Sequence, residues 1–289
     1  MSQQVVKGEV STKDPLLSRI ISQINEERIL KDLSTVQLSR FKLFDELAAE
    51  IKTSPSQTEA IKTLEDNLRE SHESLVSKYI LGLFDLEAEN GGILHLRSLL
   101  EMFQKNAKWT IVDHIADRIL EVEENNRIAL RAKVESTENL KGKKELKPYL
   151  ERLAAIDRKN PDIVRKYAMS ILDEDLPRAV TFLKQAAETY ARIKDYKNLE
   201  DIWNLLVTHD SKDLAFFERI ERVLVGNREK TRAAAYLVNL VEPYRTTENW
   251  TAVITLLKKI LEYEPNSTRA RADLVRAYRA KYEQHSLLN

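Results

Sequence analysis

Two short sequences in this chain recur at the same long distance. Trp-Thr at residues 109–110 recurs at residues 250–251, an offset of 141 (250 − 109). Ile-Leu-Glu at residues 119–121 recurs at residues 260–262, again with an offset of 141 (260 − 119). This distance equals four units of about 35 residues each. Such a period constrains the fold strongly, because each repeat must form one small unit that buries its apolar face against its neighbours.

The apolar residues inside each unit resemble the pattern of the tetratricopeptide repeat (TPR), a 34-residue pair of helices. Counting from Ile93, the matching residues are Leu96, Leu99, Leu100 and Phe103, followed by Trp109, Val112, Ala116 and Ile119. Units counted from Pro161 and Ala234 follow the same pattern, whereas Lys133 and Thr137 occupy apolar positions in a weaker unit. The sequence therefore predicts an all-α fold, a right-handed superhelical array of antiparallel helical hairpins formed by degenerate TPR-like repeats.

The composition agrees with a helical chain, and the pattern suggests three segments. Only 6 Gly and 7 Pro occur among 289 residues, too few for the tight turns of an all-β chain. We expect a flexible leader at residues 1–14 and an N-terminal helical region at residues 15–92. Residues 93–289 predict the TPR-like array, and because its apolar pattern continues to Leu288, we expect the array to be truncated at its C-terminal end.

The charge balance and the absence of cysteine argue against several classes of function. The 46 Lys and Arg residues offset the 46 Asp and Glu residues. We therefore expect no direct sequence-specific binding of nucleic acid, which needs a surplus of cations. No Cys occurs, which rules out disulfides and thiolate metal sites. The start of the chain is polar, and no apolar run reaches the roughly 20 residues of a membrane span, so we expect a cytoplasmic protein without membrane contact.

No catalytic constellation is apparent in the sequence. There is no Gly-rich phosphate loop, and the five His residues lack metal-ligand spacing. His114, beside Asp113 and Asp117, is interpreted as a half-exposed helical residue near surface carboxylates. The acidic cluster at residues 173–175 is interpreted as helix caps, and the basic run at residues 141–147 as a solvated loop. We expect no catalytic residue, metal, cofactor or small-molecule substrate, although an enzyme with an unrecognised site in the N-terminal helices remains an alternative.

Two sets of residues carry more specific expectations. Trp109, Trp203 and Trp250 lie among apolar residues at helical spacing, and we expect them to fill seams between helices.

Arg97, Arg131 and Arg165 recur every 34 residues (131 − 97 and 165 − 131) at position 5 of three successive units. The TPR resemblance implies that this position faces a concave groove, where a guanidinium could bind a carboxylate or phosphate with two hydrogen bonds. The alternative is that Arg97 pairs with Glu101 and Arg131 with Glu135, as ordinary helix pairs four residues apart.

Two segments resemble the helical N-terminal extension of unusually long GreA-type transcription elongation factors. One runs from Lys108 to Leu120 and the other from Ala277 to Leu287, and the resemblance covers roughly residues 75–289. In that family an acidic-tipped coiled coil enters RNA polymerase and aids cleavage of backtracked RNA, but this chain contains no recognisable coiled coil of that kind. The resemblance implies a non-catalytic interaction module whose protein partner is RNA polymerase. The alternative is a free-standing TPR-like adaptor that binds peptides or proteins outside transcription.

Overall fold

The computed structural model describes residues 14–29, 32–88, 93–140 and 145–287. In these residues the chain forms α-helices, one short 3-10 helix, Leu33–Thr35, and no β-strand. The α-helices are α1 (Pro15–Ile29), α2 (Leu38–Thr53), α3 (Gln57–Glu70), α4 (Leu75–Glu87), α5 (Ile93–Lys105), α6 (Trp109–Val122), α7 (Arg127–Leu140), α8 (Lys147–Ile156), α9 (Pro161–Ile171), α10 (Leu176–Ile193), α11 (Tyr196–Asp210), α12 (Leu214–Gly226), α13 (Lys230–Thr246), α14 (Trp250–Tyr263) and α15 (Thr268–Leu287). The predicted all-α fold is confirmed.

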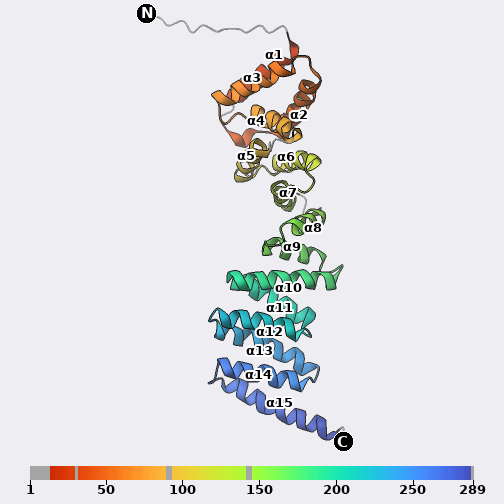
Figure 1. Ribbon diagram of the computed structural model, residues 1–289, viewed down its shortest axis with the longest axis vertical. Helices are drawn as coiled ribbons and strands as arrows, with labels where there is room; N and C mark the ends of the chain where they lie inside the picture. The colour runs from red at the N-terminus through yellow and green to blue at the C-terminus, as the bar shows by residue number, and fades with distance from the viewer. Residues whose placement is uncertain (1–13, 30–31, 89–92, 141–144, 288–289) are drawn as a thin grey trace, which may run out of the picture. The chain divides into compact units, whose positions relative to one another are not determined.

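Successive helices pack on each other as hairpins, and this confirms the predicted helical-repeat array. The chain divides into two compact units, one up to Ile156 and one from Asp157 onward. Within the second unit, Figure 1 shows α10 to α15 layered in chain order. The right-handed superhelix predicted for the whole array stays a prediction.

The first unit contains helices from both sides of the segment boundary that the sequence suggested between residues 92 and 93. Gly82 on α4 lies against Leu96 on α5, and a side-chain carbon added at Gly82 would lie 2.8 Å from Leu96 Cγ. Buried residues from α1 to α7 also belong to one hydrophobic cluster. The contacts therefore divide the chain after α8, and the expected segment boundary remains a prediction about the type of repeat. The expected leader falls, except for Asp14, outside the described residues.

Short polar side chains begin most helices of the second unit. Asn160 precedes Pro161 and accepts hydrogen bonds from two backbone N–H groups of α9, which satisfies donors that have no partner within the helix. Asp175, Asp195 and Asp213 cap α10, α11 and α12 in the same way. Polar capping residues therefore mark the starts of α9, α10, α11 and α12.

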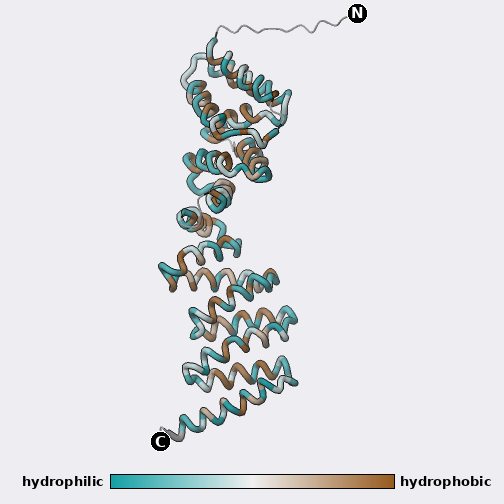
Figure 2. The backbone as a smooth tube through the Cα atoms, turned by 180° about the vertical axis from the view of Figure 1, so that it is seen from behind, coloured by the Kyte–Doolittle hydropathy of each residue, from teal (hydrophilic) through white to brown (hydrophobic). Residues whose placement is uncertain are grey.

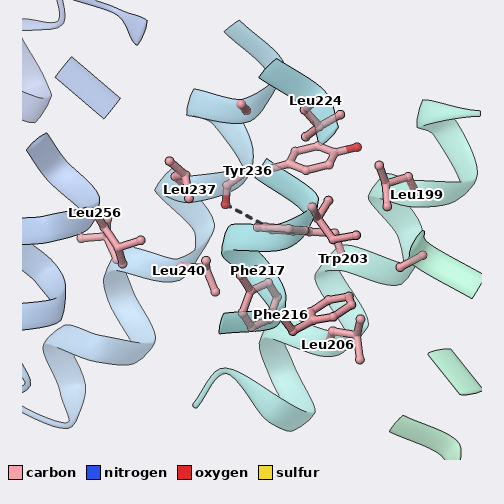
Figure 3. Close-up of a cluster of buried hydrophobic side chains, with 14 of the residues drawn as sticks. Leu199, Trp203, Leu206, Phe216, Phe217, Leu224, Tyr236, Leu237, Leu240 and Leu256 are labelled. Atoms are coloured by element: carbon pink, nitrogen blue, oxygen red, sulfur yellow. Dashed lines mark hydrogen bonds between the residues drawn. The ribbon is translucent and has the colours of Figure 1, made fainter. Parts of the chain in front are cut away.

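The second unit has an aromatic core around Trp203. Figure 3 shows the Trp203 indole on α11 between side chains of α12 and α13, with its N–H directed at the Tyr236 carbonyl oxygen. The indole Nε1 donates this hydrogen bond at 3.1 Å, and the ring centroid lies 4.8 Å from that of Phe217 in an edge-to-face arrangement. Trp203 is only 1% exposed, so the prediction that it fills a helix seam is confirmed.

Trp109 and Trp250 differ from that expectation. Each is the first residue of its helix, α6 or α14, and each is half-buried at the edge of a hydrophobic cluster. A side chain in the first turn extends toward the helix N-terminus and past the end of the packed face. These two residues therefore border the core, and only Trp203 lies within it.

The first unit has a second aromatic cluster, at the centre of α2, α4 and α5. The Phe41 ring lies 5.0 Å from that of Tyr79 and 5.4 Å from that of Phe103, both edge-to-face. Figure 2 shows hydrophobic and hydrophilic segments alternating along the helices, as expected when one face of each helix is buried.

Candidate partner-binding surface

Arg97 and Arg131 lie in the first unit, on α5 and α7, and both are exposed. Arg97 Nε donates a hydrogen bond to Glu101 Oε1, one turn along the same helix, at 2.8 Å. Gln104 of α5 donates to Glu135 of α7, which links the two helices. This surface thus carries cations, carboxylates and amides. We call Arg97, Arg131 and Arg165 the arginine series, and the pair of Arg97 with Glu101 matches the alternative interpretation of that series.

Arg165 lies on α9 in the second unit, and its guanidinium binds the neighbouring repeat. Nη1 donates to Asn198 Oδ1 at 2.6 Å and Nη2 to Asp201 Oδ2 at 3.3 Å, both on α11. The arginine series is therefore divided between two separately described units, and its binding role stays a prediction.

Sequence reasoning missed another recurrence on the second unit. Met169, Asn204 and Asn239 are separated by 35 residues each (204 − 169 and 239 − 204) and lie on α9, α11 and α13. All three are exposed, and Asn239 Nδ2 donates to Asn204 Oδ1 at 3.1 Å. Together with Arg165, these residues give the face of α9, α11 and α13 both amide groups and apolar surface, a mixture typical of protein interfaces. A search for recurring amide side chains would have found Asn204 and Asn239.

The structure corrects the interpretation of His114, which is mostly buried and bonded to groups from other helices. His114 Nε2 lies 2.9 Å from Asp45 Oδ2 on α2 and 3.2 Å from the Tyr79 hydroxyl on α4, and its side chain is 15% exposed. The Tyr79 hydroxyl donates to Asp45 Oδ1 at 2.7 Å, and Arg118 Nη2 lies 3.2 Å from Asp45 Oδ2. These contacts join α2, α4 and α6. Asp45 is 69 residues from His114 (114 − 45), so no local spacing could have predicted the contact.

The hydrogen bonds around the Asp45 carboxylate determine its charge. Burial alone would raise the pKa of Asp45, but hydrogen bonds from His114 and Tyr79 and the nearby Arg118 charge bring that pKa below its usual value. Burial and the adjacent Asp45 carboxylate raise the pKa of the Tyr79 hydroxyl, which stays protonated as a donor. These residues bond to one another and hold α2, α4 and α6 together. We call Asp45, Tyr79, His114 and Arg118 the Asp45 clamp.

Asp113 and Asp117, the neighbours of His114 in the sequence, bind Lys133 of α7. Lys133 Nζ lies 2.8 Å from Asp113 Oδ1 and 2.6 Å from Asp117 Oδ1, and the Lys133 side chain is 2% exposed. Burial by itself would lower the pKa of Lys133, but hydrogen bonds to both carboxylates raise it. The two polar residues that weakened this repeat in the sequence, Lys133 and Thr137, are therefore buried in it.

Two further polar clusters stand out in the sequence, one acidic and one basic. Within the acidic cluster, Asp175 caps α10, in agreement with its interpretation as a cap. Residues 141–144 of the basic run lie outside the described residues. Over the described ranges, no group of three or more His, Asp or Glu side chains could hold a metal ion. No described helix combines the length and the apolar character needed to cross a membrane.

Comparison with known proteins supports the resemblance seen in the sequence. The chain is 29% identical over 260 residues to a GreA-associated domains protein of Treponema pallidum, which covers 89% of this chain and 39% of the relative. It is 23% identical over 268 residues to the transcription elongation factor GreA of Borreliella burgdorferi, which covers 92% of this chain and 29% of the relative. The chain thus spans well under half the length of either relative. No family model matches it.

Among the solved structures with similar folds are TPR proteins. YrrB, described as a TPR protein with an unusual peptide-binding site, matches 73% of this chain and 97% of its own, with 13% identity and a TM-score of 0.41. The P58(IPK) TPR domain matches 93% of both chains, with 14% identity and a TM-score of 0.26. These scores are too low to transfer any residue. The chain is a TPR-like helical-repeat protein that is similar, over about nine-tenths of its length, to a GreA-associated domains protein and to a GreA transcription elongation factor.

Proposed function

We propose that this chain is a non-catalytic interaction module of a GreA-type elongation factor, and that it binds RNA polymerase in the cytoplasm. The observation that carries this proposal is the match to both relatives over 89% and 92% of the chain. Nearly the whole helical array is therefore present in proteins named for GreA. Any cleavage-promoting activity would reside in the further length that those relatives have.

The described surface supports binding to a protein. The exposed face of α9, α11 and α13 combines amides, a guanidinium and apolar side chains. The polar clusters buried in the first unit are bonded among themselves, as expected of structural groups and not of a site that awaits substrate. An array of stacked hairpins also offers an extended surface for a partner.

A binding assay tests the proposal directly. The full chain, 1–289, is immobilised, and purified core RNA polymerase is passed over it. Saturable binding that weakens with salt is expected if charged groups contribute to the interface. If the folded chain does not bind polymerase, the proposal fails and the free-standing adaptor is favoured.

The same assay tests whether the arginine series contributes to binding. If Arg97, Arg131 and Arg165 recognise acidic groups of the partner, changing all three to Ala should weaken binding at least about tenfold, since one hydrogen bond to a charged group contributes about 1.5–3 kcal/mol. The matched control is Arg192→Ala with Arg222→Ala, two exposed arginines outside the series. Equal binding by the triple variant and the control would remove the series from the interface without affecting the rest of the proposal.

A further inference from the structure

Two asparagine side chains of the second unit form a pair whose hydrogen-bonding groups are only partly used. Asn204 on α11 and Asn239 on α13 are both exposed, and Asn239 Nδ2 donates to Asn204 Oδ1 at 3.1 Å. In the described residues, the Asn204 amide nitrogen and the Asn239 amide oxygen make no hydrogen bond. We call Asn204 and Asn239 the amide pair.

The amide pair presents one free donor group and one free acceptor group on adjacent helices. Each Asn side chain carries N–H donors and a carbonyl acceptor, and the bond within the pair occupies the nitrogen of one and the oxygen of the other. The free donor lies on α11 and the free acceptor on α13, which pack directly on each other. Rotation of both amides by half a turn would exchange the two groups and leave one of each. The pair therefore fits a ligand that offers an acceptor and a donor side by side.

An extended segment of polypeptide offers this arrangement. The N–H and C=O groups of one residue in an extended strand point to the same edge, where they are free to bond outside the segment. In a helix these groups are bonded within the helix itself, so a docked helix would leave the amide pair without main-chain partners. The bonding pattern therefore favours an extended occupant over a helical one.

The charges near the amide pair indicate which extended segment fits. Three or four residues from either Asn along its helix lie Glu200, Asp201 and Glu242, all exposed, and no Lys or Arg. Residues at this spacing share a face of the helix. Asp201 pairs with Arg165 and Glu242 with Arg245, whereas Glu200 forms no ion pair in the part of the chain that the structure describes. The site therefore favours cations and disfavours the phosphates of a nucleic acid.

We propose that the amide pair binds the main chain of an extended, basic segment of a partner protein. One residue of the segment accepts a hydrogen bond from Asn204 and donates one to Asn239. A Lys or Arg of the segment pairs with Glu200, and an apolar side chain packs on Val238, which is 41% exposed. Both helices of the site have packed neighbours before and after them, since α10 packs on α11 and α14 on α13. The inference rests on the proposed function as an interaction module, and it names the surface and the chemistry of the segment that it binds.

A synthetic peptide tests this site without polymerase. The probe is a fluorescein-labelled peptide in which Lys, Val and Gly repeat three times, titrated with the full chain and followed by anisotropy. The matched control peptide carries methyl groups on the main-chain nitrogens of its Val residues, which removes those N–H donors and keeps every side chain and charge. We expect saturable binding of the probe and at least about tenfold weaker binding of the methylated peptide, a difference of about 1.4 kcal/mol. Equal binding of the two peptides, or no binding of either, would overturn the proposal.

Variants of the chain locate the site of binding. Asn204→Ala with Asn239→Ala removes both amides at exposed positions, so the thermal unfolding of the chain should be unaffected while the probe binds at least about tenfold more weakly. The matched control is Asn139→Ala with Asn266→Ala, which removes two exposed amides outside the site and should bind the probe as the wild type does. Equal binding by the two double variants would contradict the proposal. So would an oligouridylate that binds the wild type and not the variant without the amide pair, because it would identify a nucleic-acid site.

A charge variant tests the basic character of the segment. Glu200→Gln should weaken the binding of the probe and reduce its dependence on salt, and unchanged binding and salt dependence would exclude the basic segment. The peptide and polymerase assays also separate the two proposals. If polymerase does not bind but the peptide does, the proposed function alone fails; if polymerase binds and the peptide does not, this inference alone fails.

Discussion

Both compact units have aromatic clusters, but among the described residues buried polar side chains are more frequent in the first unit than in the second. In the first, buried polar groups link helices, as Asp45 does with His114 and Lys133 with Asp113. In the second, the centre is the apolar and aromatic cluster around Trp203 and Phe217, and the buried Glu221 of α12 pairs with Lys259 of α14 at 3.1 Å. The same repeat pattern therefore accommodates both kinds of core. The difference teaches that a charged residue at an apolar repeat position does not indicate a broken repeat if another helix supplies its counter-charge.

The aromatic core of the second unit should be the most sensitive to truncation. Trp203→Ala removes a 1% exposed indole and its hydrogen bond to Tyr236, and should lower the free energy of unfolding by about 3–5 kcal/mol. Trp250→Ala, at the edge of the same cluster, should cost about 1 kcal/mol. Urea unfolding followed by far-UV circular dichroism measures both. Similar losses would mean that half-buried and buried tryptophans contribute equally, against the packing described.

In the first unit, the stability contributed by Lys133, Asp113 and Asp117 should depend on their charge balance more than on the volume of their side chains. Lys133→Ala leaves Asp113 without its buried cation and should cost about 3 kcal/mol, the lower end for breaking a buried pair, because Asp117 is half-exposed. Lys133→Met with Asp113→Asn removes both charges and should recover most of the loss. Unfolding of the first unit can be followed separately by the fluorescence of Trp109 in a chain in which Trp203 and Trp250 are changed to Phe. An equally unstable double variant would contradict the charge argument.

The Asp45 clamp predicts a pH dependence confined to the first unit. The folded-state pKa of Asp45 is lowered from 3.8, so its contribution to stability is fully present above the unfolded-state pKa and is lost as pH falls through the folded-state value. Asp45→Asn should lack this contribution. The difference in unfolding free energy between wild type and variant should therefore be constant well above pH 3.8 and decrease below it. A difference that stays constant into the acid range would exclude Asp45 as the titrating group.

Substitutions at helix ends should have the smallest effect on the free energy of unfolding. Lys194 follows α10 in the left-handed backbone region, with φ of 63°, where a side chain is disfavoured and glycine is not. Lys194→Gly should therefore raise the free energy of unfolding by about 0.5–1 kcal/mol. Lys197→Gly, just inside α11, is the control and should lower it by about 1 kcal/mol. Thermal unfolding of the two variants measures the difference, and a loss in both would contradict the strain at Lys194.

The sequence alone determined the helices, their breaks and the repeat, because apolar spacing and capping residues act over one or two turns. The helical repeats and the position of Trp203 in a helix seam both correspond to features of the structure. Contacts between distant helices were decided only by the tertiary structure. His114 appeared to be a surface residue until α2 placed Asp45 against it, and Lys133 appeared to weaken a repeat until α6 placed two carboxylates around it. Burial depends on which helix lies next to a residue, and the pattern of one helix does not contain that information.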